Sequence, residues 1–137
     1  MNEMLIVLSN DRSEIVRLDR ELESFGKNCG LSGKTLAELN LVLEEVVANV
    51  IFHAYDDNLR HEIVVRAISE NKEMVVEVED DGRPFNPLQV PPPDLERPLD
   101  QIRAGGLGLH LLRRFTSDLA YERTNNKNRL LIRKKIE

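Results

Sequence analysis

The chain has few of the residues that cross-link a protein or anchor it in a membrane. It contains one cysteine, Cys29, which excludes an internal disulfide and a cysteine-rich zinc site. No apolar run approaches the ~18 residues that a membrane-spanning helix requires. The N-terminal residues become polar and acidic too early for a signal peptide. We therefore expect a cytoplasmic protein that does not associate with a membrane.

The composition is that of a globular protein with its own core. Hydrophobic residues make up 41% of the 137 positions and charged residues 31%. A chain of this length buries about two thirds of its unfolded surface, which is enough for a core without disulfides or metals. The net charge of −5 disfavours a general nucleic-acid binder. We expect a single domain over residues 1–137.

Hydrophobic spacing predicts the element order β-α-α-β-β-loop-α-β-β. This order is typical of a two-layer α/β sandwich, with helices on one face of a mixed, largely antiparallel sheet. Ser13 is expected to cap the first helix, and Ser32 or Thr35 the central one. The basic residues 133–135 are expected to solubilise an edge strand. The predicted strands are 4–8, 62–69, 73–80, 118–123 and 129–135, with turns at 70–72 and 124–128.

The central helix, Leu39 to Tyr55, carries polar groups on a mostly apolar segment. Glu45 and Asn49 are four residues apart, so they lie one turn apart on the same face. Buried polar groups need partners, and oxygen atoms of this kind suit Mg²⁺, which takes one or two protein ligands and adds phosphate oxygens. The alternative is that these residues, with Glu44, form the solvated side of an amphipathic helix.

A second signal is an aspartate at the inward end of a strand. Met74, Val76 and Val78 share one face, and the period of two places Asp80 on that same face. Such a carboxylate could accept a hydrogen bond from a ligand, for example from an adenine amino group. The alternative is a turn aspartate, because Gly82 follows closely.

A third signal is a long irregular segment before a glycine-rich turn. Residues 86–104 hold most of the six prolines, so they form neither a continuous helix nor a central strand. Loops of this length are often lids or binding loops. The sequence Gly105-Gly106-Leu107-Gly108 then opens a helix, whose N-terminal N–H groups can bind phosphate.

The three signals occur in the order seen in the ATP-binding domain of the histidine kinase, gyrase and heat-shock ATPase superfamily (GHKL), the Bergerat fold. EEVVANVIFHAY resembles the N box, DDGRPF the first glycine box and GGLGLHLL the second. The nearest resemblance is to the small bacterial anti-sigma factors that are serine-protein kinases. The segment before residue 32 contains no histidine, unlike the phospho-accepting helix of sensor kinases.

The resemblance implies a role for each matching position. Asn49 would coordinate Mg²⁺, Glu45 would be the general base, and Asp80 would bind the adenine amino group. Gly82 would let the backbone approach the base, and His53 would belong to the nucleotide site or only end its helix. Gly105, Gly106, Leu107 and Gly108 would form the phosphate cradle, and Arg103 or Arg97 would serve as the lid arginine. Pro84 replaces a glycine of the family pattern.

Two functions follow from this resemblance. The first is a Mg-ATP-dependent kinase that phosphorylates a serine of a STAS-type anti-anti-sigma partner. The second is a nucleotide-responsive binding module that sequesters a sigma factor or another regulator with little or no catalysis. A plain α/β domain without a nucleotide site is the third reading. The family resemblance also allows a homodimer, and the partner surface could be the helix face around Arg17–Glu23 or the lid.

Overall fold

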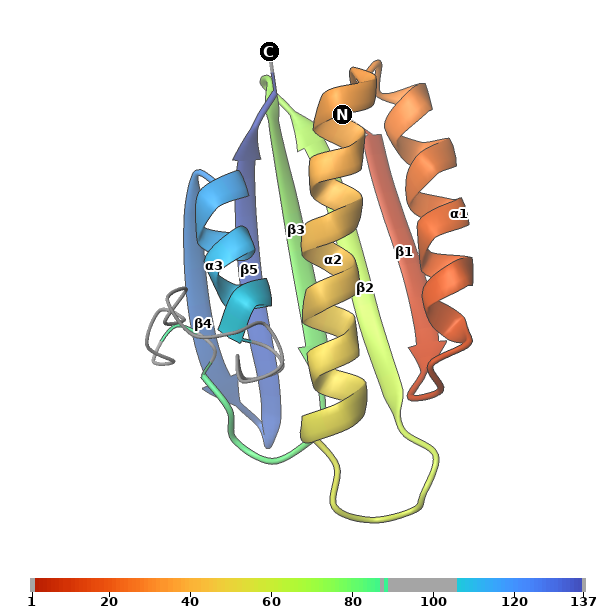
Figure 1. Ribbon diagram of the computed structural model, residues 1–137, viewed down its shortest axis with the longest axis vertical. Coiled ribbons are helices and arrows are strands. Elements are labelled where there is room, and N and C mark those ends of the chain that lie inside the picture. Colours follow the sequence, from red (N-terminus) through yellow and green to blue (C-terminus); the bar gives the residue numbers. More distant parts are fainter. Residues whose placement is uncertain (1, 87, 89–105, 137) are drawn as a thin grey trace.

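The computed structural model has the predicted element order (Figure 1). It describes residues 2–86, 88 and 106–136. Its strands are β1 (Asn2–Ser9), β2 (Glu62–Glu70), β3 (Glu73–Asp80), β4 (Asp118–Thr124) and β5 (Lys127–Lys135). Its helices are α1 (Glu14–Asn28), α2 (Gly33–His53) and α3 (Gly106–Phe115).

The strands form one sheet in the order β1-β2-β3-β5-β4. Among the described residues, all strand pairs are antiparallel. The sequence had predicted a mixed, largely antiparallel sheet, which allowed for a parallel pair. β3 is the middle strand, and β5 lies between β3 and β4. The predicted two-layer sandwich is confirmed, and its central strand is the one that ends in Asp80.

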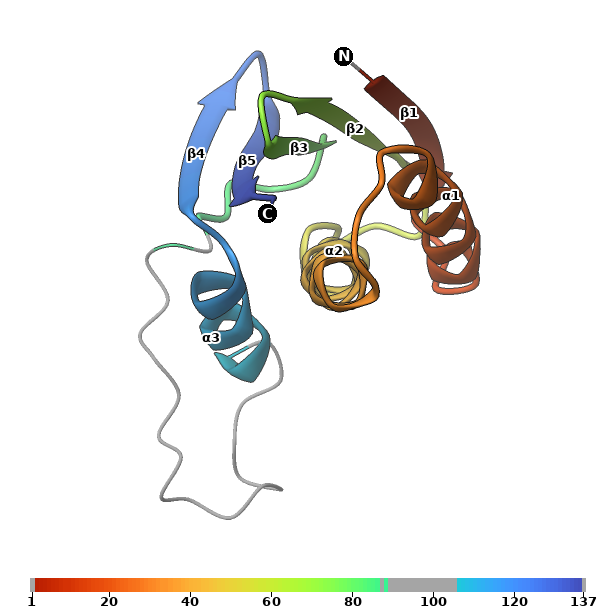
Figure 2. The same ribbon diagram turned by 90° about the horizontal axis from the view of Figure 1, so that it is seen from above.

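All three helices cover the same face of the sheet, with α2 between α1 and α3 (Figure 2). The core lies between these layers, because the alternating apolar residues of the strands meet the apolar stripes of α1 and α2. Among the described residues, none of the helices combines the length and apolarity that crossing a bilayer needs. The fully buried large side chains include Leu8, Leu18, Leu22, Leu39, Leu43, Ile63, Met74, Leu112 and Ile132.

Both tight hairpins turn through pairs of left-handed residues. Asn71 and Lys72 have φ of 54° and 60°, and Asn125 and Asn126 have φ of 54° and 62°. Asparagine tolerates this conformation better than most residues, and it matches the twist of a two-residue hairpin. The predicted turn at 124–128 was therefore too long, and Asn128 lies inside β5.

The helix starts confirm one predicted cap and correct another. Ser32 caps α2, since its side chain accepts a hydrogen bond from the Thr35 N–H at 3.1 Å. Ser13 makes no side-chain cap for α1. Instead, the Asp11 carboxylate accepts bonds from the Ser13 N–H and hydroxyl at 2.9 and 2.8 Å. An aspartate turn therefore sets the start of α1.

The basic end of β5 is not an edge, which corrects the prediction of a solubilising role. Lys134 is 8% exposed, and its ammonium group donates to Glu38 Oε2 at 3.1 Å and to the Phe115 carbonyl at 2.7 Å. Arg133 pairs with Glu73 at 2.8 Å. Because β5 is an interior strand, Lys134 joins it to α2 and to the end of α3, and Arg133 joins it to β3, while Lys135 is exposed.

Candidate functional site

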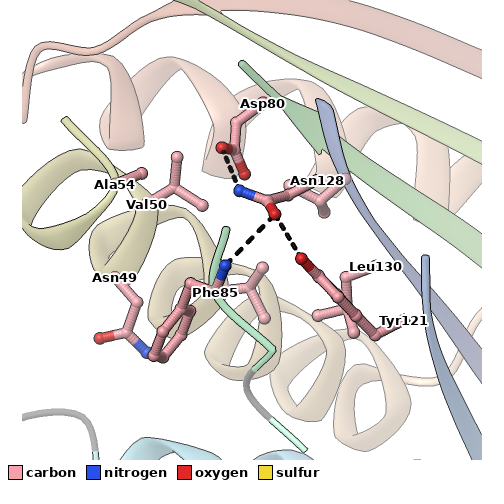
Figure 3. Close-up of a pocket in the computed structure, with 10 residues that line it drawn as sticks. Asn49, Val50, Ala54, Asp80, Phe85, Tyr121, Asn128 and Leu130 are labelled. Carbon is pink, nitrogen blue, oxygen red and sulfur yellow. Dashed lines mark hydrogen bonds between the residues drawn. The ribbon is translucent and has the colours of Figure 1, made fainter. Parts of the chain in front are cut away.

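A narrow pocket lies between the C-terminal half of α2, the end of β3 and the β4–β5 hairpin (Figure 3). Its cavity measures about 40 Å³, which is room for roughly three water molecules. The walls are mostly apolar, and a small number of polar groups converge on the space, a lining typical of small-molecule sites, although this cavity is smaller than the ~300 Å³ at which such sites begin. The lining residues are Val46, Asn49, Val50, Ala54, Val78, Asp80, Phe85, Tyr121, Asn128 and Leu130.

Asp80 is the buried acid of this pocket. It continues the inward face of β3, as predicted, and is 5% exposed. Its Oδ1 accepts hydrogen bonds from the Gly82 N–H at 2.9 Å and from Asn128 Nδ2 at 3.0 Å. Burial raises the pKa of Asp80, while these two bonds oppose the rise. Within the described residues Oδ2 accepts no hydrogen bond, so this carboxylate keeps an acceptor for a ligand.

Asn128 is a site residue that the sequence analysis missed. It is 5% exposed, and its Nδ2 also donates to the Arg83 carbonyl at 2.7 Å. Its Oδ1 accepts from the Phe85 N–H at 3.3 Å and from the Tyr121 hydroxyl. A two-residue turn at 125–126 would have put Asn128 on the inward face of β5, so the available signal was the Asn-Asn pair.

Gly82 lies against the end of α2. A Cβ at this position would stand 2.5 Å from both the Cβ and the carbonyl oxygen of Ala54. The next residue, Arg83, donates its N–H to the Ala54 carbonyl and its Nε to the His53 carbonyl, both at 2.8 Å. Glycine is therefore required here by the contact with the helix, and the expected approach of its backbone to a base stays a prediction. The His53 side chain is exposed and does not line the pocket.

The two polar residues of the α2 stripe have different positions. Asn49 lines the pocket, and its carboxamide has no hydrogen bond to another described residue. Glu45 is half-buried one turn earlier and is not among the lining residues. Within the described ranges, no three or more histidine, cysteine or acidic side chains gather as a metal cluster. A cation here would take the Asn49 oxygen and obtain its other ligands from phosphate and water, which suits Mg²⁺.

The glycine-rich turn leads into α3. Gly106 is the first residue of that helix, and Leu107 and Gly108 follow in its first turn. Figure 1 shows α3 starting beside the half of α2 that carries Asn49. The first N–H groups of a helix lack partners within the helix and can bind anions. Arg97, Arg103 and Gly105 lie outside the described residues, as does almost all of the segment 86–104 that was expected to be a lid.

Comparison with known proteins assigns the family. Residues 8–134 match the model of the Histidine kinase-like ATPase domain. The chain belongs to this family. Membership in the histidine kinase-like ATPase domain family implies ATP binding, in agreement with the resemblance seen in the three motifs.

Curated relatives of this histidine kinase-like domain are bacterial protein kinases and anti-sigma factors. The serine/threonine-protein kinase BtrW of Bordetella bronchiseptica is 31% identical over 94 residues, which cover 69% of this chain and 66% of BtrW. The serine-protein kinase RsbW of Listeria monocytogenes is 26% identical over 113 residues, which cover 79% of this chain and 72% of RsbW. The anti-sigma F factor of Clostridium acetobutylicum is 26% identical over 119 residues, covering 82% and 78%.

A solved structure supports the histidine kinase-like fold. The crystal structure of the RsbU and RsbW domains of Rv1364c from Mycobacterium tuberculosis superposes with a TM-score of 0.73 at 14% identity. The match covers 99% of this chain and 33% of that one. At this identity the likeness establishes the shared fold.

Proposed function

We propose that this protein binds Mg-ATP and transfers the γ-phosphoryl group to a serine of a STAS-type anti-anti-sigma protein. One observation carries the nucleotide part of the proposal. The buried Asp80 carboxylate has one oxygen engaged by Gly82 and Asn128 and the other without a described partner, in the same pocket as Asn49. An acceptor fixed in this way suits the amino group of adenine.

The remaining residues are assigned to the parts of the nucleotide beyond the base, which are the metal ion and the phosphates. Asn49 would hold Mg²⁺, which would neutralise charge on the phosphate oxygens. Gly106, Leu107 and Gly108 would offer the N–H groups of the first turn of α3 to phosphate, with Gly105 completing the cradle. Arg103 would be the lid arginine that faces the γ-phosphate. His53 is placed at the end of α2 and not on the nucleotide in this proposal, because its side chain is exposed and only its backbone carbonyl is engaged, by Arg83 Nε.

Glu45 is proposed as the general base. The serine hydroxyl oxygen forms a bond to the γ-phosphorus, the bond from that phosphorus to the ADP oxygen breaks, and Glu45 accepts the hydroxyl proton. Positioning and electrostatic stabilisation supply most of the rate enhancement in such transfers. Glu45 lies one helical turn from Asn49, which places the base next to the proposed metal ligand.

The names of the relatives support the choice of acceptor and partner. BtrW and RsbW are named as serine or serine/threonine-protein kinases, and another relative is named as an anti-sigma F factor. These names favour a protein acceptor over a small molecule, and a sigma factor as a further partner.

A non-catalytic, nucleotide-responsive binding module is the second candidate. Glu45 does not line the pocket that holds Asp80 and Asn49, and this observation favours the alternative. In that case nucleotide would control the affinity for a sigma factor or another regulator without phosphate transfer.

Calorimetric titration tests the nucleotide site. Mg-ATP and Mg-ADP are titrated into the wild type and into Asp80→Asn, which replaces the acceptor oxygen by an amide. We expect binding by the wild type and a large loss in the variant. An unchanged affinity in Asp80→Asn would remove Asp80 from the site, and absence of binding by the wild type would overturn the proposal.

Glu45→Gln separates the two functions. Phosphate transfer from labelled ATP to a STAS-domain protein is measured together with ATP affinity. We expect transfer to be abolished while ATP affinity stays within a few-fold. Transfer at the wild-type rate would exclude Glu45 as the base, and no transfer by the wild type would favour the binding module.

A further inference from the structure

We infer that Asn128 is the positioning residue of the base site and sets its preference for a purine that carries an exocyclic amino group. The inference rests on the proposed function and deepens it. Its basis is the number of site groups that this one buried side chain holds at once.

The Asn128 carboxamide uses both of its ends. Nδ2 donates to Asp80 Oδ1 at 3.0 Å and to the Arg83 carbonyl at 2.7 Å. Oδ1 accepts from the Phe85 N–H at 3.3 Å and from the Tyr121 hydroxyl. A flipped carboxamide would turn Oδ1 toward the oxygens of Asp80 and Arg83 and its N–H groups toward the Phe85 N–H, so these three bonds would be lost. Its orientation is therefore fixed, with the N–H groups toward Asp80.

This orientation determines what Asp80 can recognise. A donor from Asn128 and one from Gly82 both engage Oδ1, which leaves Oδ2 as the acceptor in the pocket. An acceptor facing the ligand favours an amino group and disfavours a carbonyl oxygen at the same position of the purine. Asn128 thus acts on the ligand through Asp80.

The same side chain also positions one wall of the pocket. Phe85 lines the cavity, and its backbone N–H donates to Asn128 (Figure 3). The Arg83 carbonyl, two residues earlier, also accepts a hydrogen bond from Asn128. Tyr121 lines the pocket from β4, and its hydroxyl donates to the Asn128 Oδ1. The acceptor and the aromatic wall therefore keep a fixed relation to each other.

The test compares ATP with purine riboside triphosphate, which lacks the 6-amino group. Both are titrated with Mg²⁺ into the wild type, Asn128→Ala, Tyr121→Phe and the control Thr124→Ala, whose exposed hydroxyl bonds only Glu122 among described residues. We expect about a tenfold preference for ATP in the wild type and in the control. The preference should fall to about one- to twofold in Asn128→Ala and to an intermediate ratio in Tyr121→Phe.

The pH dependence of binding gives a second readout. Asn128 donates to the Asp80 carboxylate and lowers its pKa against the effect of burial. In Asn128→Ala the pKa of Asp80 rises further, so ATP affinity should begin to fall at a higher pH than in the wild type when the solution is acidified. Circular dichroism and thermal unfolding confirm that each variant is folded; Tyr121→Phe, which keeps the ring, carries the test if Asn128→Ala does not fold.

The possible outcomes separate the inference from the proposed function. Asn128→Ala could lower the affinities for ATP and for purine riboside triphosphate equally, with the wild-type affinity ratio and the wild-type pH dependence retained. That result would make Asn128 a purely structural residue and overturn the inference. A wild type that binds neither nucleotide would overturn the proposed function itself. Loss of the preference for ATP in Asn128→Ala, together with a shifted pH dependence of ATP affinity, supports both the inference and the proposed function.

Discussion

Gly82 and Ala54 are in such close contact that no side chain fits between them. A Cβ on residue 82 would stand 2.5 Å from the Ala54 carbonyl oxygen and 2.9 Å from its carbonyl carbon. The Arg83 N–H binds the same oxygen at 2.8 Å. The end of α2 and the turn after Asp80 are therefore joined as one unit, and neither can shift alone.

Gly82→Ala tests this contact. The added methyl group must displace backbone atoms, so we expect the free energy of unfolding to fall by about 2–3 kcal/mol. Urea unfolding measures the change. Gly33→Ala is the matched control, since a Cβ there meets nothing within 4 Å at the start of α2. That control should be neutral or stabilising by up to about 1 kcal/mol; equal effects of the two substitutions would contradict the packing argument.

Lys134→Met removes the buried cation of β5. The change leaves Glu38, whose side chain is 20% exposed, without its ion pair and the Phe115 carbonyl without this donor. We expect a loss of about 3 kcal/mol in the free energy of unfolding. Adding Glu38→Gln should recover part of that loss, because the unpaired charge disappears. Lys127→Met removes a half-exposed cation whose partner Glu79 keeps its ion pair with Arg129, so it should cost about 0.5 kcal/mol or less.

Asp19→Asn should stabilise the protein at alkaline pH. Burial, together with the nearby carboxylate of Glu44, raises the pKa of Asp19 from 3.8 to about 7. The folded state therefore holds a proton that the unfolded state releases, and stability falls as pH rises between these values. We expect the variant to exceed the wild type in unfolding free energy at pH 8 and to approach it near pH 5.

The exposed Asp56→Asn is the charge-matched control for that measurement. In this control, the unfolding free energy measured with urea should depend on pH as it does in the wild type. If the unfolding free energy of Asp19→Asn changes with pH as steeply as that of the wild type, Asp19 does not hold the extra proton of the folded state.

His61→Gln should reduce the stability of the protein under mildly acidic conditions. Nε2 lies 2.7 Å from Asp57 Oδ1, Nδ1 lies 3.1 Å from Asp81 Oδ1, and the ring stacks on Tyr55 with centroids 4.1 Å apart. Only the protonated ring donates at both nitrogens, and the hydrogen bond with Asp57 raises the pKa of His61 above 6.5.

The sign of this effect follows from the raised pKa. The stabilisation is complete below the unfolded value of 6.5 and is lost as pH rises through the folded value. We therefore expect the deficit of His61→Gln, measured by urea unfolding, to be largest near pH 6 and to shrink at pH 9. His53→Gln, at an exposed histidine, should show no such trend; a deficit of His61→Gln that is constant with pH would contradict the ion pairs.

Much of the fold was readable because local patterns and burial agree. The period of two along 73–80 located β3 and placed Asp80 inward, and the four-residue spacing of Glu45 and Asn49 put them on one stripe of α2. The antiparallel pairs β2–β3 and β4–β5 matched the two predicted hairpins, whereas the order of the strands across the sheet was not predicted. The predicted features depend on neighbours close in sequence, which a single sequence reveals.

The missed features depend on distant neighbours or on turn chemistry. Asn128 was assigned to a turn because the left-handed pair Asn125-Asn126 was not recognised as sufficient to reverse the chain. The contact of Gly82 with Ala54 joins segments that only the fold brings together. Lys134 was read as a surface cation because its partner Glu38 lies on α2, 96 positions away.

The position of β5 between β3 and β4 makes the pocket and the C-terminal hairpin a single cooperative unit. Asn49, Asp80 and Asn128 come from three elements, and a hairpin that detaches takes one of them away. If nucleotide binds in this pocket, as proposed, it can occupy only molecules in which the hairpin is docked. Bound nucleotide would then oppose the opening of the hairpin by about 2.7 kcal/mol at a hundred times the dissociation constant. Resistance of β4 and β5 to proteolysis and hydrogen exchange would thus report occupancy of the site, whether or not phosphate is transferred.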